Sequence, residues 1–390
     1  MAENMAENLF VERLSLTDFR NYAHLVLEAG TGPVVLFGAN GSGKTNLLEA
    51  VSLLAPGQGL RRAPYAELTR AAASGGWAVA ARVHTRNGRV DIGTGLDPAA
   101  SLRPGPVTGR IVRIDGEPAG SGALADYLEI VWLTPAMDGL FTGPASERRR
   151  FLDRLVLCFD PGFRSLAGRF ERATQSRNRL LADGVRDNAR LEGVEIIMAE
   201  AGTAIAAARI ATVRRLADVI AGRRERDPES PFPWSGIELE GTLEAALVSS
   251  PAVDVEDGYV RRLAQARERD RAAGRTLEGP HRSDLIVSHG PKGMLARLSS
   301  TGEQKALLTG LVMAEAELIA LRHTGAAPIL LLDEITAHLD ETRRQGLFAE
   351  ILRLGAQAWM TGTDASAFKA LSGRAQILRV ADANLEPVEL

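Results

Sequence analysis

The sequence is short of several residue types, and each shortage excludes a class of protein. Cys158 is the single cysteine among 390 residues, which excludes a disulfide framework and a cysteine-based zinc site and fits a reducing compartment. No stretch approaches the ~20 uninterrupted apolar residues of a membrane span. The N-terminus has neither the cationic nor the apolar region of a secretion signal. We therefore expect a cytoplasmic protein with no membrane partner.

An excess of charge of one sign is also missing. The formal net charge is −3, from 46 Lys and Arg residues against 49 Asp and Glu residues. The whole-chain charge therefore gives no support for a polyanionic partner such as nucleic acid. Only four lysines occur, at Lys44, Lys292, Lys305 and Lys369. Their scarcity makes the position of each one informative.

A glycine-rich segment follows a predicted strand at 33–37 and precedes a predicted helix. Extended by one residue, it reads Gly38, Ala39, Asn40, Gly41, Ser42, Gly43, Lys44, Thr45 and Asn46. This is the complete phosphate-loop spacing in its correct strand-to-helix context. Glycines let backbone N–H groups surround a phosphate, and the helix N-terminus adds its positive dipole. We predict a nucleotide site in which Lys44 reaches the β- and γ-phosphates and the Thr45 hydroxyl binds Mg²⁺.

A second apolar run, at 329–332, ends in two carboxylates, Asp333 and Glu334. An uninterrupted apolar run of this length is typical of a buried parallel strand. A phosphate loop needs an acidic partner for its metal, so Asp333 is predicted to hold Mg²⁺ directly or through water. Glu334 is then the candidate base that orients or deprotonates the attacking water. Lys44, Asp333 and Glu334 form the predicted catalytic set.

A Ser/Thr/Gly cluster at 299–302 precedes another predicted helix. Ser300 and Gly302 at a helix N-terminus can form an anion site. Because one loop already cradles the phosphates of this chain, the second site would serve the nucleotide of another subunit. An ordinary helix cap is the alternative explanation.

The pattern along the chain predicts an α/β protein whose two ends form one domain. Short strands broken by glycine and proline between 77 and 114 indicate an antiparallel β-segment. Helical spacing dominates from 147 to 222, and a proline-containing link from 223 to 251 leads to a final helix at 256–273. We expect residues 1–135 and 275–390 to form the nucleotide-binding domain and 136–274 to form a mainly helical insertion, a lid or arm.

The phosphate loop, the Ser-x-Gly-Glu-Gln segment and the apolar-Asp-Glu segment, in this order, resemble the ATPase head of the ABC superfamily. The resemblance implies an ABC-type P-loop head, with ATP and Mg²⁺ as cofactors. It also implies an ATP-dependent homodimer in which two heads enclose two ATP molecules. Ser300 and Gly302 would contact the γ-phosphate bound by the partner, and Asp340 would lie at the dimer interface. At 361–364 there is no histidine, where transporter-type heads keep a γ-phosphate sensor.

A narrower resemblance covers nearly the whole chain. The specific segments are LTDFRNY at 16–22, SERRRFLD at 146–153, QSRNRLL at 175–181 and GPHRSDL at 279–285. They are similar to the RecF family, which implies ATP-dependent binding to gapped or single/double-strand junction DNA. The family's function further implies work with RecR and RecO to help load RecA, and slow ATP hydrolysis that times release from DNA.

Local charge differs from the net charge. Arginines that could contact DNA phosphates without reading bases are Arg61, Arg62, Arg148, Arg149 and Arg150. They belong to a basic pair after the phosphate loop and to an arginine-rich stretch between 147 and 181. Another arginine cluster lies between 261 and 275. Solvated helix faces give the same composition, so these residues are candidates only.

Three other functions share parts of this pattern. A transporter nucleotide-binding subunit would have the same ATP sandwich, but the long helical insertion and the FRNY-type opening are against it. A larger chromosome-structuring ATPase would need a long coiled coil, and the ~130-residue insertion has no sustained heptads. An ATP-gated nuclease would need a further acidic metal cluster, which the sequence does not reveal.

Overall fold

The structure, a computed structural model, describes residues 9–73, 75–96, 109–185, 187–337 and 339–389. The chain forms two compact units. The head unit comprises Met1–Asp138, Glu229–Phe232 and Thr301–Leu390, and the helical unit comprises Gly139–Pro228 and Pro233–Ser300. The first junction falls close to its expected place, whereas the chain returns to the head at Thr301 rather than at 275.

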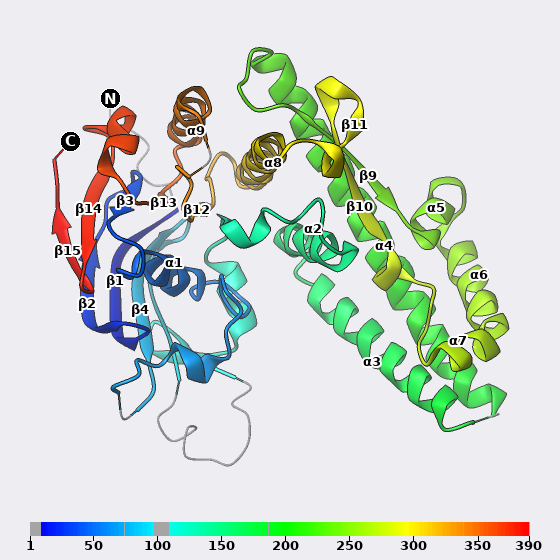
Figure 1. Cartoon of the computed structure of the whole chain (residues 1–390). Helices are drawn as coiled ribbons and strands as arrows, with labels where there is room; N and C mark the ends of the chain where they lie inside the picture. The colour runs from blue at the N-terminus through cyan, green and yellow to red at the C-terminus, as the bar shows by residue number, and fades with distance from the viewer. Residues whose placement is uncertain (1–8, 74, 97–108, 186, 338, 390) are drawn as a thin grey trace. The chain divides into compact units, whose positions relative to one another are not determined.

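A mixed six-stranded sheet carries the head unit. Its strand order is β15-β14-β3-β13-β12-β8, and all neighbours are parallel except β15, which pairs antiparallel with β14. The strands are β3 (Val34–Phe37), β8 (Ile130–Leu133), β12 (Ile329–Leu332), β13 (Ala358–Gly362), β14 (Gln376–Ala381) and β15 (Asn384–Pro387). All of β12 and β13 is buried, as expected for strands in the middle of a parallel sheet that is covered on both faces. N-terminal and C-terminal strands therefore lie side by side (Figure 1).

An antiparallel sheet of order β2-β1-β4-β5-β6-β7 completes the head. Its strands are β1 (Phe10–Phe19), β2 (Tyr22–Glu28), β4 (Ala78–Thr85), β5 (Gly88–Gly95), β6 (Ile111–Ile114) and β7 (Glu117–Ala119). Burial alternates along β4, because only one face of this sheet meets the core. Apolar residues of both sheets and of α1 (Lys44–Ser52) form one buried cluster. The antiparallel segment predicted from the sequence is confirmed.

Two further helices belong to the head, α8 (Thr301–Arg322) and α9 (Glu341–Leu354). Helix α8 packs on β8 and on α9. Short 3₁₀ helices connect the elements of both units: η1 (Tyr65–Leu68), η3 (Ser121–Asp126), η4 (Pro135–Met137), η5 (Pro280–Arg282), η6 (Gly290–Lys292), η7 (Ala296–Leu298) and η8 (Ala365–Leu371).

The helical unit combines helices with a small sheet. Its helices are α2 (Ala145–Phe159), α3 (Phe163–Ala182), α4 (Asn188–Arg226), α5 (Thr242–Ser249), α6 (Ala252–Gln265) and α7 (Arg267–Ala273). Its sheet has the order β11-β10-β9, with β9 (Ser235–Glu240), β10 (Asp284–His289) and β11 (Met294–Leu295). The predicted link from 223 to 251 thus contains a strand. Because β10 pairs with β9, the segment after 275 stays in the helical unit.

Helix α4 is long and apolar enough to cross a membrane by length and composition alone. It packs against α3 and α6. Three charged or polar side chains on its buried stripe, those of Glu195, Arg209 and Thr212, make hydrogen bonds inside the unit. These contacts fit the core helix of a helical bundle.

Candidate nucleotide site

The two halves of the predicted nucleotide site meet at the carboxyl edge of the parallel sheet. The phosphate loop leaves β3, and Asp333 follows β12, with only β13 between these two strands. The Thr45 hydroxyl donates a hydrogen bond to Asp333 Oδ1 at 2.9 Å. Residues separated by almost 300 positions are thereby brought into direct contact. This arrangement is expected if Thr45 and Asp333 bind the same metal ion.

The phosphate loop needs glycine at two positions for steric reasons. Gly38 has a φ of 150°, and a Cβ there would lie 2.3 Å from the Val380 carbonyl oxygen. Gly43 has a φ of 112°, and a Cβ there would lie 2.5 Å from Asn21 Nδ2. Both conformations are strained for any other residue. The loop is therefore fixed on one side by β14 and on the other by the β1–β2 turn.

Lys44 is held inside the loop that it is predicted to serve. Its Nζ donates hydrogen bonds to the carbonyl oxygens of Gly38 and Ala39, both at 2.7 Å. Burial lowers the pKa of Lys44, and the charges of Glu334 and Asp333 oppose that shift. An ammonium group has three N–H donors, so two are used on the loop and one remains for a phosphate oxygen. The lysine is thus preorganised for an anion.

Asp333 and Glu334 differ in their surroundings. Asp333 is buried, and its Oδ1 accepts hydrogen bonds from the hydroxyls of Thr45 and Thr361. Glu334 is exposed, and it has a left-handed φ of 51°. None of the ion pairs found among the described residues involves either carboxylate. Carboxylate and hydroxyl oxygens are the donors that Mg²⁺ prefers, so Thr45 and Asp333 fit this ion.

Two residues of the LTDFRNY segment, Asn21 and Tyr22, make hydrogen bonds to the phosphate loop. The sequence alone did not predict this role. Asn21 donates to the carbonyl oxygen of Ser42 at 3.2 Å, and the Tyr22 hydroxyl donates to that of Gly43 at 3.2 Å. Burial raises the pKa of Tyr22, so the phenol stays a neutral donor. Asn21 also accepts from Asn46, the last residue of the predicted nucleotide-binding segment. The β1–β2 turn therefore supports the phosphate loop from outside.

Buried Glu49 of α1 organises the arginines near this loop. Arg20 forms a two-pronged pair with it, at 2.8 and 2.9 Å. Arg61 lies 3.6 Å from Glu49 and donates to Asn46 Oδ1 at 2.9 Å. Arg62 is exposed, with a left-handed φ of 53°. Arg61 is therefore connected to the nucleotide segment, and both arginines retain exposed surface.

The residues predicted to act on the partner's nucleotide lie at helix starts. Ser300 directly precedes α8, and Gly302 is in its first turn. Asp340 caps α9, since its carboxylate accepts from the Arg343 backbone N–H at 2.8 Å. Near the first turn of α8, Lys305 pairs with Asp138 at 2.8 Å. This pair lines a cavity of about 60 Å³ that Asp333 and Glu334 also border.

The three consecutive arginines of α2 have different environments. Arg148 makes two bonds to Asp284, at 2.7 and 2.8 Å, and donates to three backbone carbonyls. Arg149 donates to the Ser283 carbonyl at 2.6 Å, and burial, with the nearby charge of Arg209, lowers its pKa. Arg150 is exposed and pairs with Glu147. The bonds of Arg148 inside the protein indicate a structural role, and its predicted role at DNA stays a prediction.

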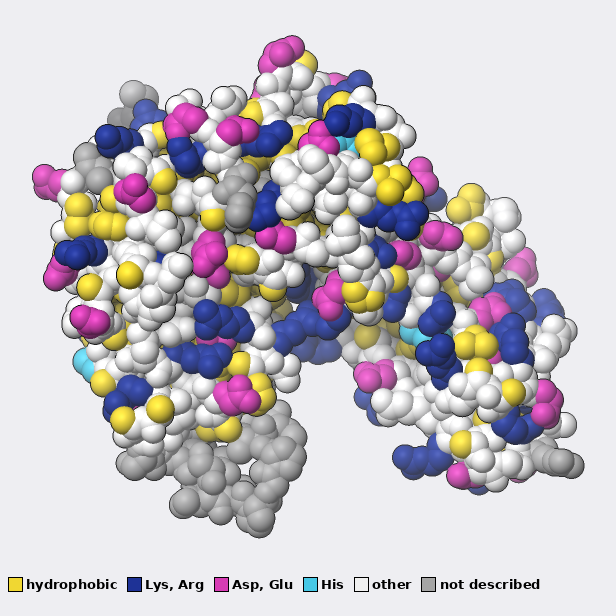
Figure 2. All heavy atoms as spheres, viewed as in Figure 1, with side chains coloured by type: hydrophobic (Ala, Val, Ile, Leu, Met, Phe, Trp, Pro, Cys, Tyr) yellow, Lys and Arg dark blue, Asp and Glu magenta, His cyan; other side chains and the backbone are white. Residues whose placement is uncertain are grey.

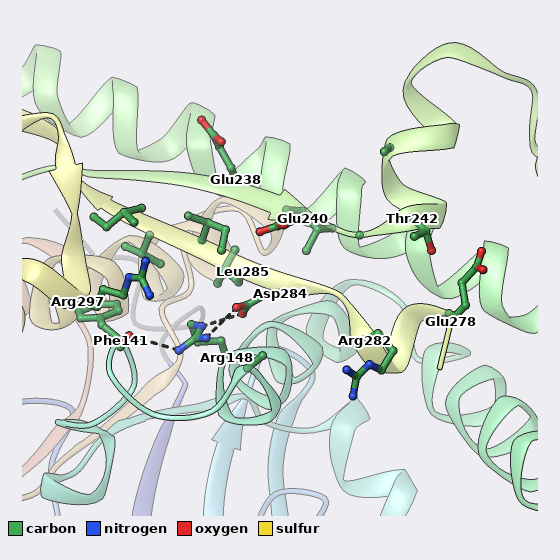
Figure 3. A pocket seen from close by; sticks show the side chains of 18 of the residues that line it. Phe141, Arg148, Glu238, Glu240, Thr242, Glu278, Arg282, Asp284, Leu285 and Arg297 are labelled. Atoms are coloured by element: carbon green, nitrogen blue, oxygen red, sulfur yellow. Dashed lines mark hydrogen bonds and ion pairs between the residues drawn. The ribbon is translucent and has the colours of Figure 1, made fainter. Parts of the chain in front are cut away.

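A groove of about 1110 Å³ in the helical unit runs along β9 and β10. Arg148 and Asp284 point toward each other inside it (Figure 3). Arg282 and Glu278 lie at one end and Arg297 at the other (Figure 3). Lys and Arg side chains are interspersed with Asp and Glu side chains over the face of each unit shown in Figure 2.

One arginine of the family-specific segments, Arg177, is fully buried, whereas Arg179 and Arg282 are exposed. Arg177 is 0% exposed and bonds to Glu195, Asp270, Thr276 and the Leu263 carbonyl. The sequence carried a signal for this: Arg177 lies on the buried stripe of α3, four residues after Ala173 and three before Leu180. The number of arginines between 147 and 181 is therefore larger than the number that lie on the surface of the protein.

Arg209 of α4 is another buried arginine of the helical unit. It forms a two-pronged pair with Asp153, at 2.8 and 2.9 Å, and bonds to Ser283 and the Pro280 carbonyl. Asp153 ends the SERRRFLD segment, and Pro280 and Ser283 belong to GPHRSDL. Two of the segments that carried the family resemblance thus meet in the core of the helical unit.

The sequence of this chain is similar to those of known proteins. The RecF/RecN/SMC N terminal domain family matches residues 10–383. A DNA replication and repair protein RecF of Mesorhizobium japonicum is 54% identical over 99% of this chain and 100% of its own length. One of Brucella suis is 52% identical over 98% of this chain and 97% of its own length.

Solved structures show the same fold. The recombination mediator protein RecF-ATPrS in the RecFOR pathway has a TM-score of 0.85 at 21% identity, covering 98% of this chain and 99% of that one. The SmcHead bound to the C-winged helix domain of ScpA has a TM-score of 0.56 at 16% identity, covering 98% of this chain and 97% of that one. At these identities the likeness concerns the fold.

Fold and site together define an ATPase head of the ABC type, as found in SMC-like proteins, with an inserted helical unit. The transporter alternative is not favoured by any of these relatives. The chain belongs to the RecF family of DNA replication and repair proteins.

Proposed function

We propose that this chain is an ATP-driven DNA clamp of recombinational repair and replication-fork maintenance. ATP and Mg²⁺ would join two copies on gapped or single/double-strand junction DNA, and slow hydrolysis would time their release. The observation that carries the proposal is the Thr45–Asp333 hydrogen bond, which unites the two halves of a nucleotide site. A solved relative is described as a recombination mediator in the RecFOR pathway. This description supports RecR and RecO as partners. The proposal adds RecA as the downstream protein and the cytoplasm as the location.

Each residue of the site has a role that its surroundings support. Lys44 would turn its free N–H toward the phosphates, and the backbone of 38–43 would surround them. Thr45 and Asp333 would hold Mg²⁺, which neutralises phosphate charge when bound. Glu334, exposed beside them, would orient the attacking water and accept its proton.

Dimerisation would complete the site. Ser300 and Gly302, at the start of α8, would reach the γ-phosphate bound by the partner copy, and Asp340 would lie at the interface. A dimer that closes only with ATP links nucleotide binding to affinity for DNA, because ATP stabilises the state that it binds. Hydrolysis then lowers the stability of the closed state.

The decisive experiment measures sedimentation and binding to gapped DNA, with and without ATP. Glu334→Gln should retain ATP and accumulate the dimer, whereas Lys44→Ala should lose ATP binding and stay monomeric. Ser300→Ala should bind ATP but fail to dimerise. Exposed Lys369 provides the matched control, since Lys369→Ala removes the same charge outside the site. Equal DNA binding by all of these proteins, regardless of nucleotide, would refute the clamp.

For the DNA surface we retain Arg61, Arg62, Arg148, Arg149 and Arg150 as candidates. Arg150→Gln should weaken DNA binding uniformly across sequences and reduce the salt dependence by about one phosphate contact. Arg164→Gln is the control, because Arg164 is an exposed arginine of the same unit. If both variants lose DNA affinity equally, the effect is one of overall charge, and Arg150 is no longer a candidate for DNA contact.

A further inference from the structure

Thr361 connects the two acidic residues of the nucleotide site. It lies on β13, the strand between β3 and β12, and it is 0% exposed. Its hydroxyl donates to Asp333 Oδ1 at 2.8 Å and accepts from the Glu334 backbone N–H at 2.7 Å. One buried hydroxyl therefore uses its donor on one carboxylate residue and its acceptor on the next.

The bond to Glu334 N fixes an unfavourable backbone. A φ of 51° is left-handed, and such a conformation persists only where neighbouring groups hold it. The Thr361 hydroxyl accepts from the N–H of this residue, and the Glu334 carbonyl accepts from the Ala337 N–H at 3.0 Å. Because the backbone sets the direction of the side chain, Thr361 helps to direct the Glu334 carboxylate.

The bond to Asp333 fixes a carboxylate orientation. Oδ1 is shared by the hydroxyls of Thr45 and Thr361, and the side-chain hydrogen bonds described for Asp333 all involve this oxygen. Thr361 sits on a buried central strand, whereas Thr45 begins the helix after the phosphate loop. The Thr361 bond can therefore remain when Thr45 turns toward a metal ion.

We propose that Thr361 is a positioning residue that aims Asp333 at Mg²⁺ and Glu334 at the attacking water. This inference rests on the proposed ATPase function and adds a residue to it. Hydrogen-bond partners of metal ligands commonly contribute about 10- to 100-fold to metal affinity or activity. A valine at this position has nearly the same shape but cannot make either bond.

The test compares Thr361→Val with Thr361→Ser, which keeps the hydroxyl. Thr212→Val is the matched control: Thr212 is also buried, and its hydroxyl bonds only to the Ala208 carbonyl of its own helix. Three quantities are measured: Mn²⁺ affinity of the ATP-bound protein by electron paramagnetic resonance, ATP affinity in EDTA, and kcat for ATP hydrolysis. Thermal unfolding checks that each variant is folded.

Thr361→Val should bind Mn²⁺ about 10- to 100-fold more weakly and lose a similar factor in kcat. Its ATP affinity in EDTA should stay within about twofold of wild type, since Lys44 and the loop are intact. Thr361→Ser and Thr212→Val should resemble wild type. Wild-type Mn²⁺ affinity in Thr361→Val, or failure of Thr361→Ser to restore it, would overturn the inference. Absence of ATP binding and hydrolysis in wild type would instead overturn the proposed function.

Discussion

The buried charged side chains of the nucleotide site in the head and those around Arg177 in the helical unit have different kinds of partner. In the head, Lys44 bonds to backbone carbonyls and Asp333 bonds to hydroxyls. In the helical unit, Arg177 meets Glu195 and Asp270 at 3.0 and 2.7 Å. The charge of Arg177 is therefore paired with carboxylates inside the fold, whereas neither Lys44 nor Asp333 takes part in an ion pair among the described residues.

This difference separates two kinds of family-specific segment. Among the described residues Lys44, Asp333 and Glu334 make no ion pair, although the two carboxylates act electrostatically on Lys44. Charged groups held together in this way are typical of ligand sites. Arg148 of SERRRFLD pairs with Asp284 of GPHRSDL, and Arg177 of QSRNRLL pairs with Asp270 elsewhere in the helical unit. A motif that identifies a family can therefore be structural rather than functional.

The largest effect on stability should come from breaking the buried network. Arg177→Met leaves Glu195 and Asp270 without their shared cation, and removing one partner of a buried pair costs about 3–5 kcal/mol. Hydrogen exchange should show faster opening of α3, α4 and α7, while ATP affinity of the head is retained. A variant with wild-type protection in these helices would contradict the structural role of Arg177.

A smaller loss is expected at Arg148. Arg148→Gln should reduce the free energy of unfolding by about 2 kcal/mol, the size expected for hydrogen bonds to charged groups. Arg150→Gln, on the exposed side of the same helix, should change it by less than about 0.5 kcal/mol. Denaturant unfolding of the two variants checks this. Equal stabilities would mean that the Asp284 pair contributes nothing to the fold.

At the nucleotide site we expect a small effect on stability and a large effect on ATP hydrolysis. Asp333→Asn removes a carboxylate that makes no ion pair among the described residues, and the amide oxygen can still accept the two hydroxyl hydrogen bonds, so stability should change by less than about 1 kcal/mol. Mg²⁺-dependent hydrolysis should nevertheless be lost, because a neutral amide is a poor ligand for Mg²⁺. Unfolding and ATPase assays on the same preparation test both statements. A large loss of stability would place Asp333 in the structural class with Arg177.

The smallest effect should be a change in pH dependence at His281. Burial lowers its pKa below the usual ~6.5, and the charges of Arg282, Arg149 and Arg209 act in the same direction. The folded chain therefore binds this proton less readily than the unfolded chain, so stability decreases as pH falls through about 6.5. His281→Gln should flatten the stability profile between pH 7 and 5. His24→Gln, at an exposed position, is the control for the loss of an imidazole.

Much of the site could be predicted because it depends on local backbone. The loop 38–45 must be glycine-rich and must lie between a strand and a helix, whatever surrounds it. An uninterrupted apolar run that ends in two acids is typical of a buried strand with its carboxylates at the sheet edge. The contact between Thr45 and Asp333 follows once β3 and β12 are placed in one sheet.

Other features depend on contacts between distant segments. Thr361 has no sequence pattern of its own, and its role arises only because β13 lies between β3 and β12. The strand at 235–240 was hidden among prolines and glycines, and pairing with β10 moved the boundary expected at 275. The spacing of Arg177 along α3 was visible, but its partners come from α4, α7 and the loop at Thr276.

The sequence by itself determined the phosphate loop, its acidic partner, the α/β class and the family, because short-range geometry and spacing carry that information. Only the tertiary structure decided which arginines are available. A net charge of −3 and a list of basic residues are sums over the chain, whereas the availability of each guanidinium depends on the carboxylate that folding places beside it. Arg148 and Arg177 are used within the fold, and Arg150 stays at the surface.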